Sequence, residues 1–172
     1  QRVVAVHEYD AEGRIRAQTD VTVRTSKPRF LSGCGGLMST ARDYWRFAQA
    51  LADGGALDGK RILKEETVAL MRTNVLKPGV AVDLYGPTQK GIGFGMDFAI
   101  VMDPKAAGTP QGVGSFFWGG AFGTGFWIGP TNQIVVVGLI QNRDGSRPDL
   151  GTPRLRDISY AATYRALTTA AR

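Results

Sequence analysis

Residues 115–141 read SFFWGGAFGTGFWIGPTNQIVVVGLIQ. Their apolar runs at 115–120, 124–128 and 134–141 are rich in aromatic and β-branched residues, which predicts three strands. Glycines and the segment Gly129-Pro130-Thr131-Asn132 separate these runs and predict turns. The last run is apolar on both faces, so we expect it to form a central strand covered by helices on both sides.

The sequence on either side of this region predicts further strands and helices. Strands are predicted at 93–101 and, as an opening β-hairpin, at 3–9 and 15–23, and helices at 41–52, 65–73 and 153–171. Thr40 and Asp43 have the spacing of a capping box at the start of the first helix, and Gly54-Gly55 ends it. The segment 57–60 predicts a tight turn. We expect the last helix to pack on the sheet through the apolar residues Leu155, Ile158, Ala162 and Leu167.

Composition limits the classes of protein and of site. The chain has 172 residues, which fits one domain, with 43% hydrophobic and 21% charged residues and a net charge of +6. The basic residues are interleaved with acidic ones and form no block of five or six, which argues against nucleic-acid binding. One cysteine and one histidine cannot make an internal disulfide or a four-ligand zinc site. No apolar run is long enough for a transmembrane helix, and the first ten residues lack the pattern of a leader.

Several familiar catalytic patterns are incomplete in this sequence. The segment 54–61 approaches a phosphate-binding loop, but Arg61 stands where that loop needs a hydroxyl. The glycines at 91–95 precede a strand pattern, which does not fit a dinucleotide-binding turn. His7 lies among apolar neighbours and no G-x-S-x-G motif occurs, so we interpret it as structural. Cys34 has no partner for a catalytic dyad, and we interpret it as a small residue in a turn.

The aromatic and glycine cluster at 116–125 leaves two interpretations open. Glycines weaken a strand, so several together indicate that a ligand or another backbone passes close by. The alternative is a kinked hairpin with aromatic packing. The cluster alone does not decide between them.

Three groups of residues, in order along the chain, resemble the serine β-lactamase-like family. They are the segment 33–44 (GCGGLMSTARDY) with the turn at 54–59, the segments 66–71 and 91–95, and Trp118-Gly119-Gly120 with the strand 126–130. This family includes class C β-lactamases, penicillin-binding DD-peptidases and related esterases. The resemblance covers most of the chain.

The resemblance implies acyl transfer through a serine ester. The family's nucleophile lies in an S-x-x-K motif, and a Y-x-N or S-x-N motif handles the proton. Neither motif occurs in this sequence. Both lie upstream in the family, so we expect the chain to be the C-terminal part of a longer serine hydrolase and to be inactive alone.

The family's third motif, K-T-G, aligns with Trp118-Gly119-Gly120. In K-T-G members, the Lys and Thr side chains bind a substrate carboxylate, so the W-G-G form favours a neutral ester. The W-G-G form is also similar to that of the β-lactamase-like esterases. The resemblance assigns the backbone N–H of Ala121 to half of the oxyanion hole. Gly119 and Gly120 would let the acyl group lie against the strand. Trp118 and Phe122 would line the same wall of the cleft.

The expected fold class is α+β, with an antiparallel sheet flanked by helices. Residues 1–172 would form the C-terminal part of a β-lactamase-like domain, with a helical region at 40–75 and strands plus a terminal helix at 92–172. Such a part leaves apolar surface uncovered, so its partner would be the missing N-terminal portion or a second copy. No cofactor, metal, nucleic acid or membrane span is implied.

Two alternatives remain open at this stage. One is a β-lactamase or DD-peptidase, and the other is a non-catalytic module that binds a peptide or glycan on its aromatic surface. Substrates would be small esters or amides. The resemblance implies a bacterial protein, in the periplasm, outside the cell or in the cytoplasm.

Overall fold

A computed structural model describes residues 3–18, 29–33, 35–83, 88–143, 149 and 153–170. Cys34 and the predicted strand residues beyond Gln18 lie outside the described residues. The elements in chain order are β1 (His7–Tyr9), β2 (Ile15–Ala17), α1 (Ala41–Ala52), β3 (Ala56–Leu57), β4 (Lys60–Arg61), α2 (Glu65–Met71), β5 (Ile92–Phe94), β6 (Ala99–Val101), α3 (Pro104–Ala107), β7 (Phe116–Gly119), β8 (Gly125–Gly129), the 3₁₀ turn Pro130–Asn132, β9 (Ile134–Gly138) and α4 (Leu155–Ala170).

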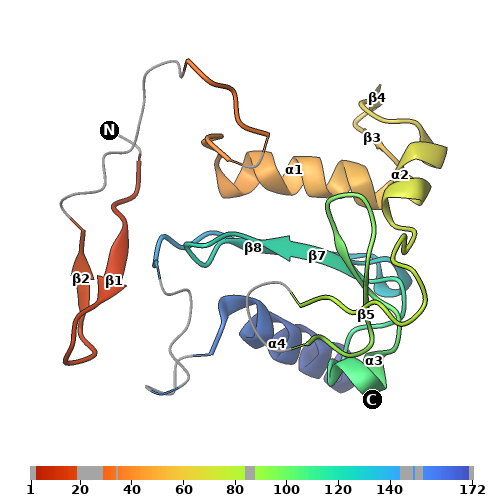
Figure 1. Cartoon of the computed structure of the whole chain (residues 1–172). Helices are drawn as coiled ribbons and strands as arrows, with labels where there is room; N and C mark the ends of the chain where they lie inside the picture. Colours follow the sequence, from red (N-terminus) through yellow and green to blue (C-terminus); the bar gives the residue numbers. More distant parts are fainter. Residues whose placement is uncertain are drawn as a thin grey trace.

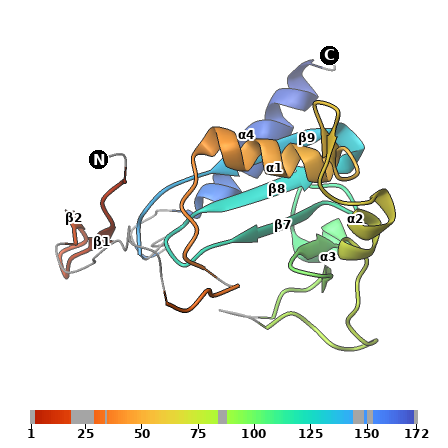
Figure 2. The same cartoon turned by 90° about the horizontal axis from the view of Figure 1, so that it is seen from above.

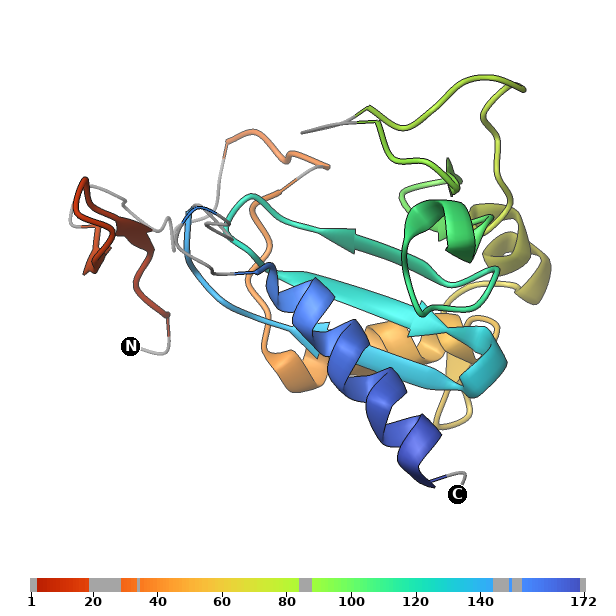
Figure 3. The same cartoon turned by 90° about the horizontal axis from the view of Figure 1, so that it is seen from below.

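In the described part of the chain, five strands form one antiparallel sheet in the order β5-β6-β7-β8-β9. Figure 1 shows α1 on one face of this sheet and α4 on the other, and the turned views in Figures 2 and 3 show the same three layers. Two further hairpins, β1–β2 and β3–β4, lie outside the sheet. The α+β class with an antiparallel sheet flanked by helices is confirmed.

Alternation along the strands divides the core between the two faces. On the α1 side, Phe116, Phe126 and Ile128 pack with Ala48 and Leu51 of the helix. Their neighbours along the strands point to the other face, as the two-residue period of a strand requires. There Phe117 and Trp127 pack with Tyr160 of α4.

Helix α1 has the bounds that its sequence predicts. The Thr40 side chain accepts a hydrogen bond from the Asp43 N–H at 3.1 Å and donates one to the Asp43 carboxylate at 2.8 Å. At the other end, Gly54 and Gly55 take positive φ angles of 68° and 93°. A Cβ on Gly55 would lie 2.3 Å from the Leu63 carbonyl oxygen, so only glycine fits this helix end.

The predicted strand at 93–101 is instead two strands, β5 and β6, joined by a tight turn. The Gly95 N–H bonds to the Phe98 carbonyl at 2.8 Å, and Asp97 has a φ of 68°. A Cβ on Gly95 would lie 2.1 Å from the Met71 carbonyl oxygen. The turn therefore packs against the end of α2, a contact between distant residues that periodicity does not reveal.

The position of β9 and the packing face of α4 also differ from the predictions. Helices do cover both faces of β9, but within the described residues it is the last strand of the sheet and not a central one. The terminal helix does pack on the sheet. Tyr160 and Tyr164 place their rings against Trp127, and the predicted residue Leu155 lies beside Gly138 of β9. The other predicted packing residues, Ile158, Ala162 and Leu167, are exposed.

Large apolar side chains are exposed in the segment before α1. In the segment before α1, Phe30 and Leu31 are 80% and 76% exposed, and Leu37 is 97% exposed. Three large apolar side chains within eight residues are more than single exposed residues scattered over a surface.

Candidate functional site

The predicted site lies where β7 runs past the end of β6. Strand β6 pairs with β7 at Phe116 and Phe117. Strand β8, on the other side, pairs with β7 at all four of its residues, ending at Gly119↔Gly125. In the described part of the chain, the outer edge of β7 therefore has no strand partner from Trp118 onward.

Hydrogen-bond alternation shows which backbone groups face that open edge. The Ser115 carbonyl accepts from the Val101 N–H of β6 at 2.8 Å, and the Gly120 N–H donates to the Thr124 carbonyl on the β8 side at 2.9 Å. Along an antiparallel strand, the N–H and C=O of one residue point to the same side, and successive residues alternate between the two sides. Gly119 shares the side of Ser115, so it directs its N–H and C=O to the open edge. An open strand edge of this kind can pair with an extended substrate.

Ala121 follows in a tight turn between β7 and β8. The Gly123 N–H bonds to the Gly120 carbonyl at 3.0 Å, which places Ala121 at the first of the two central turn positions. Ala121 is exposed. Its N–H has no hydrogen bond to another described residue, so it is a donor available to a ligand.

Contacts within the β7–β8 hairpin favour glycine at positions 119 and 120. A Cβ on Gly120 would lie 2.5 Å from the Thr124 hydroxyl, and one on Gly119 would lie 3.1 Å from the Thr124 carbonyl oxygen. Both glycines are exposed. Backbone of the same hairpin therefore approaches Gly119 closely, whereas the group that approaches Gly120 is the Thr124 side chain.

The two aromatic residues of the predicted site have different surroundings. The half-buried Trp118 packs its ring edge-to-face against Phe94, with the ring centres 5.0 Å apart. Phe122 is also half-buried, and its carbonyl accepts the Asn142 N–H at 2.9 Å. This bond ties the β7–β8 turn to the segment after β9.

The first hairpin contacts the segment after β9. His7 pairs in parallel with Asn142, and its N–H bonds to the Gln141 carbonyl at 2.8 Å. The His7 ring bonds to the Ala5 carbonyl at 3.0 Å. These contacts give His7 a structural role, as its apolar neighbours predict.

The charged and titratable groups with perturbed pKa values lie elsewhere. Hydrogen bonds from Arg16 and Arg14 lower the pKa of Asp10 to about 2, and burial raises the pKa values of Tyr44 and Tyr160. The described residues contain no group of three or more side chains arranged to hold a metal ion, and no helix long and apolar enough to cross a membrane. The site thus offers backbone donors and aromatic walls.

An antiparallel sheet between helical layers is the architecture of a β-lactamase- and transpeptidase-type domain. The chain belongs to the Beta-lactamase family, whose family model matches residues 2–160. The resemblance stated from the sequence motifs is therefore confirmed.

Curated relatives are longer than this chain. The Mycobacterium tuberculosis protein Rv1367c is 33% identical over 183 residues, covering 97% of this chain and 46% of that protein. Esterase EstB of Burkholderia gladioli is 32% identical over 131 residues, covering 76% of this chain and 31% of the esterase. The chain spans less than half the length of these relatives.

Solved structures agree with this fold. EstCE1, described as a hydrolase with promiscuous acyltransferase activity, matches with a TM-score of 0.57 and 25% identity over 80% of this chain and 38% of its own. Simvastatin synthase (LovD) from Aspergillus terreus matches with a TM-score of 0.67 over 82% of this chain and 37% of its own. At 20% identity the second match shows the fold alone.

Proposed function

We propose that this chain is the C-terminal part of a serine hydrolase that cleaves small neutral esters through an acyl-enzyme. The observation that carries the proposal is the open edge of β7, where W-G-G stands in place of K-T-G and the Ala121 N–H is unpaired among the described residues. The similarity to EstB, an esterase, and to EstCE1, a hydrolase, supports the same chemistry.

The reaction would divide between the two parts of the longer protein. A serine from the part outside this chain attacks the ester carbonyl, the acyl–oxygen bond breaks, and the alcohol leaves with a proton. Water then attacks the acyl-enzyme and releases the acid. The N–H of Ala121 would stabilise the negative charge on the carbonyl oxygen, together with the N–H of the nucleophilic serine. Trp118 and Phe122 would line one wall.

The W-G-G form favours an uncharged substrate. In a K-T-G site, a lysine and a threonine hydroxyl bind a carboxylate of the substrate. Here Trp118 and Gly119 stand at those two positions. Neither side chain supplies a cation or a hydroxyl, so a carboxylate would lose its hydration without gaining a partner.

Activity on two chromogenic substrates tests the substrate class. The longer protein that contains this chain should hydrolyse short-chain p-nitrophenyl esters and leave a chromogenic cephalosporin intact. Strong cephalosporin turnover without esterase activity would instead favour a β-lactamase or DD-peptidase. A protein that turns over neither substrate and lacks S-x-x-K upstream would support the non-catalytic binding module.

A second experiment tests whether the nucleophilic serine lies outside this chain. A fluorophosphonate, which labels activated serines covalently, should leave this chain unlabelled when it is expressed alone. It should label the longer protein at a serine outside the chain. Labelling of a serine within residues 1–172 would contradict the proposal.

A further inference from the structure

We propose that an apolar pocket beside β5 binds the hydrocarbon group of the substrate ester and sets its chain-length preference. The pocket has a volume of about 370 Å³ and is lined by Leu76, Ala81, Val82, Asp83 and Phe94. This volume lies within the range of small-molecule sites. The inference rests on the proposed esterase function, because it names the part of the ester that the chain recognises.

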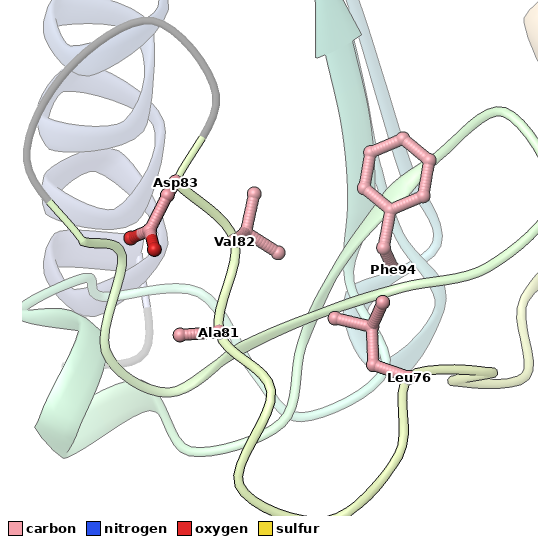
Figure 4. A pocket seen from close by; sticks show the side chains of 5 residues that line it. All are labelled: Leu76, Ala81, Val82, Asp83 and Phe94. Atoms are coloured by element: carbon pink, nitrogen blue, oxygen red, sulfur yellow. The ribbon is translucent and has the colours of Figure 1, made fainter.

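The inner wall of the pocket is apolar. In Figure 4 the Val82 side chain faces the side of the pocket where Phe94 lies, and the Leu76 side chain lies below the Phe94 ring. The carboxylate of Asp83 lies on the far side of Val82 from the Phe94 ring. A hydrocarbon group fits this lining, whereas a charged group would lose hydration without gaining a partner.

Asn74 holds two walls of the pocket in place. Its side-chain oxygen accepts the Leu76 N–H at 3.2 Å and the Phe94 N–H at 3.0 Å. A Cβ on Gly93 would lie 2.7 Å from Asn74 Cγ, so the glycine makes room for this side chain. One side chain therefore fixes the loop to β5 across 20 residues of sequence.

Two backbone contacts complete the support. The Val75 N–H bonds to the Phe94 carbonyl at 2.9 Å. The Gln89 N–H bonds to the Val82 carbonyl at 3.0 Å, where the two residues form an antiparallel bridge. Walls fixed in this way exist before a ligand binds, which lowers the entropy cost of binding.

Phe94 connects the pocket to the proposed active-site wall. Its ring lines the pocket and also lies edge-to-face against Trp118, with the ring centres 5.0 Å apart. The proposal therefore places the ester carbonyl at the open edge of β7 beside Trp118 and the hydrocarbon group in the pocket that the Phe94 ring lines. Each methylene that becomes buried should raise kcat/KM about fourfold until the pocket is full.

The test measures kcat/KM of the longer protein for two ester series. The first keeps the p-nitrophenyl leaving group and lengthens the acyl chain from acetate to octanoate. The second keeps the acetyl group and enlarges the alcohol from phenyl to naphthyl. A rise along one series identifies which side of the ester enters the pocket.

Two variants then locate the effect in the pocket. Ala81 lies exposed at the rim, so Ala81→Phe should narrow the pocket without disturbing the core. It should lower kcat/KM at least tenfold for the largest preferred ester and leave the smallest unchanged. Leu76→Ala should shift the preference toward larger groups. Ala161→Phe, on an exposed position of α4, is the matched control and should change neither.

The outcomes separate the two proposals. If no ester is hydrolysed, the esterase function fails and the pocket's assignment fails with it. If esters are hydrolysed but neither series shows a size preference, the function stands and the pocket assignment is wrong. The same holds if Ala81→Phe and Leu76→Ala both act equally on every ester.

Discussion

Replacing Ala121 by proline should remove one oxyanion donor while keeping the turn that carries it. Ala121 is the first central residue of the turn closed by the bond from the Gly123 N–H to the Gly120 carbonyl. Proline is favoured at that position because its fixed φ matches the turn. The preceding residue is a glycine, which tolerates the restriction that proline imposes on its neighbour.

The expected effect of Ala121→Pro follows from the hydrogen bonding of the Ala121 N–H. Among the described residues it has no hydrogen-bond partner, so its removal breaks no bond of the folded chain. The loss should therefore appear in catalysis and not in stability. Removing one oxyanion donor lowers kcat by about 10²–10³, or ~3–4 kcal/mol of transition-state stabilisation.

The assay compares steady-state hydrolysis of a p-nitrophenyl ester by the parent protein and the variant. A donor that acts mainly on the transition state predicts a large fall in kcat with little change in KM. Ala121→Gly is the matched control, because it changes the side chain but keeps the N–H. Thermal unfolding of both variants checks that the turn is intact.

One result would refute the reasoning directly. If Ala121→Pro unfolds at the parent temperature and retains the parent kcat, this N–H does not stabilise the transition state. A loss of activity shared equally by Ala121→Gly would point to the side chain instead. Either result removes Ala121 from the proposed oxyanion hole.

Three further predictions concern stability. Gly120→Ala should destabilise the fold by less than about 1 kcal/mol, because the overlapping Thr124 hydroxyl can rotate away at an exposed site, and Thr124→Ala in the same protein should restore the denaturation midpoint. Asn74→Ala should cost about 1–3 kcal/mol by leaving two backbone N–H groups without their acceptor, whereas Asn74→Asp should cost less. The hydrogen bond from Arg16 is the largest cause that lowers the pKa of Asp10 from 3.8 to about 2. Ionised Asp10 therefore stabilises the fold above about pH 4, and this stabilisation is lost as the pH falls toward 2. Asp10→Asn should flatten that part of the curve of unfolding free energy against pH.

Local signals in the sequence predicted α1 in full. The Thr40–Asp43 cap, the apolar period and Gly54-Gly55 each act within a few residues, so no knowledge of the fold is needed to find the helix bounds. The cores of β7 and β8 were predicted for the same reason. The face of α4 was predicted only in part, because Leu155 does lie beside Gly138 of β9 but two tyrosines, and no aliphatic residue, place their rings against Trp127.

The parts that sequence reasoning missed depend on contacts between distant residues. The loop before β5 shows no periodicity, and its pocket exists because Asn74 bonds to Phe94. The edge position of β9 follows from the order of strands in space. For the site, resemblance supplied the residues at 118–122, whereas the open edge beside them became visible only when β6 and β7 were seen to pair over two residues.

The length of the open edge of β7 depends on where β6 begins, after the turn that joins it to β5. Gly95 lies against the Met71 carbonyl oxygen, where no side chain fits, and the Met96 N–H bonds to that oxygen at 3.1 Å. The chain therefore reverses at this point, and β6 begins at Ala99, opposite Phe117. Had β5 continued, as the apolar run predicts, no hairpin would form and the pairing along β7 would be different. The turn at 95–98 thus lies against the end of α2, and the start of β6 at Ala99 leaves β7 without a strand partner on that side from Trp118 onward among the described residues.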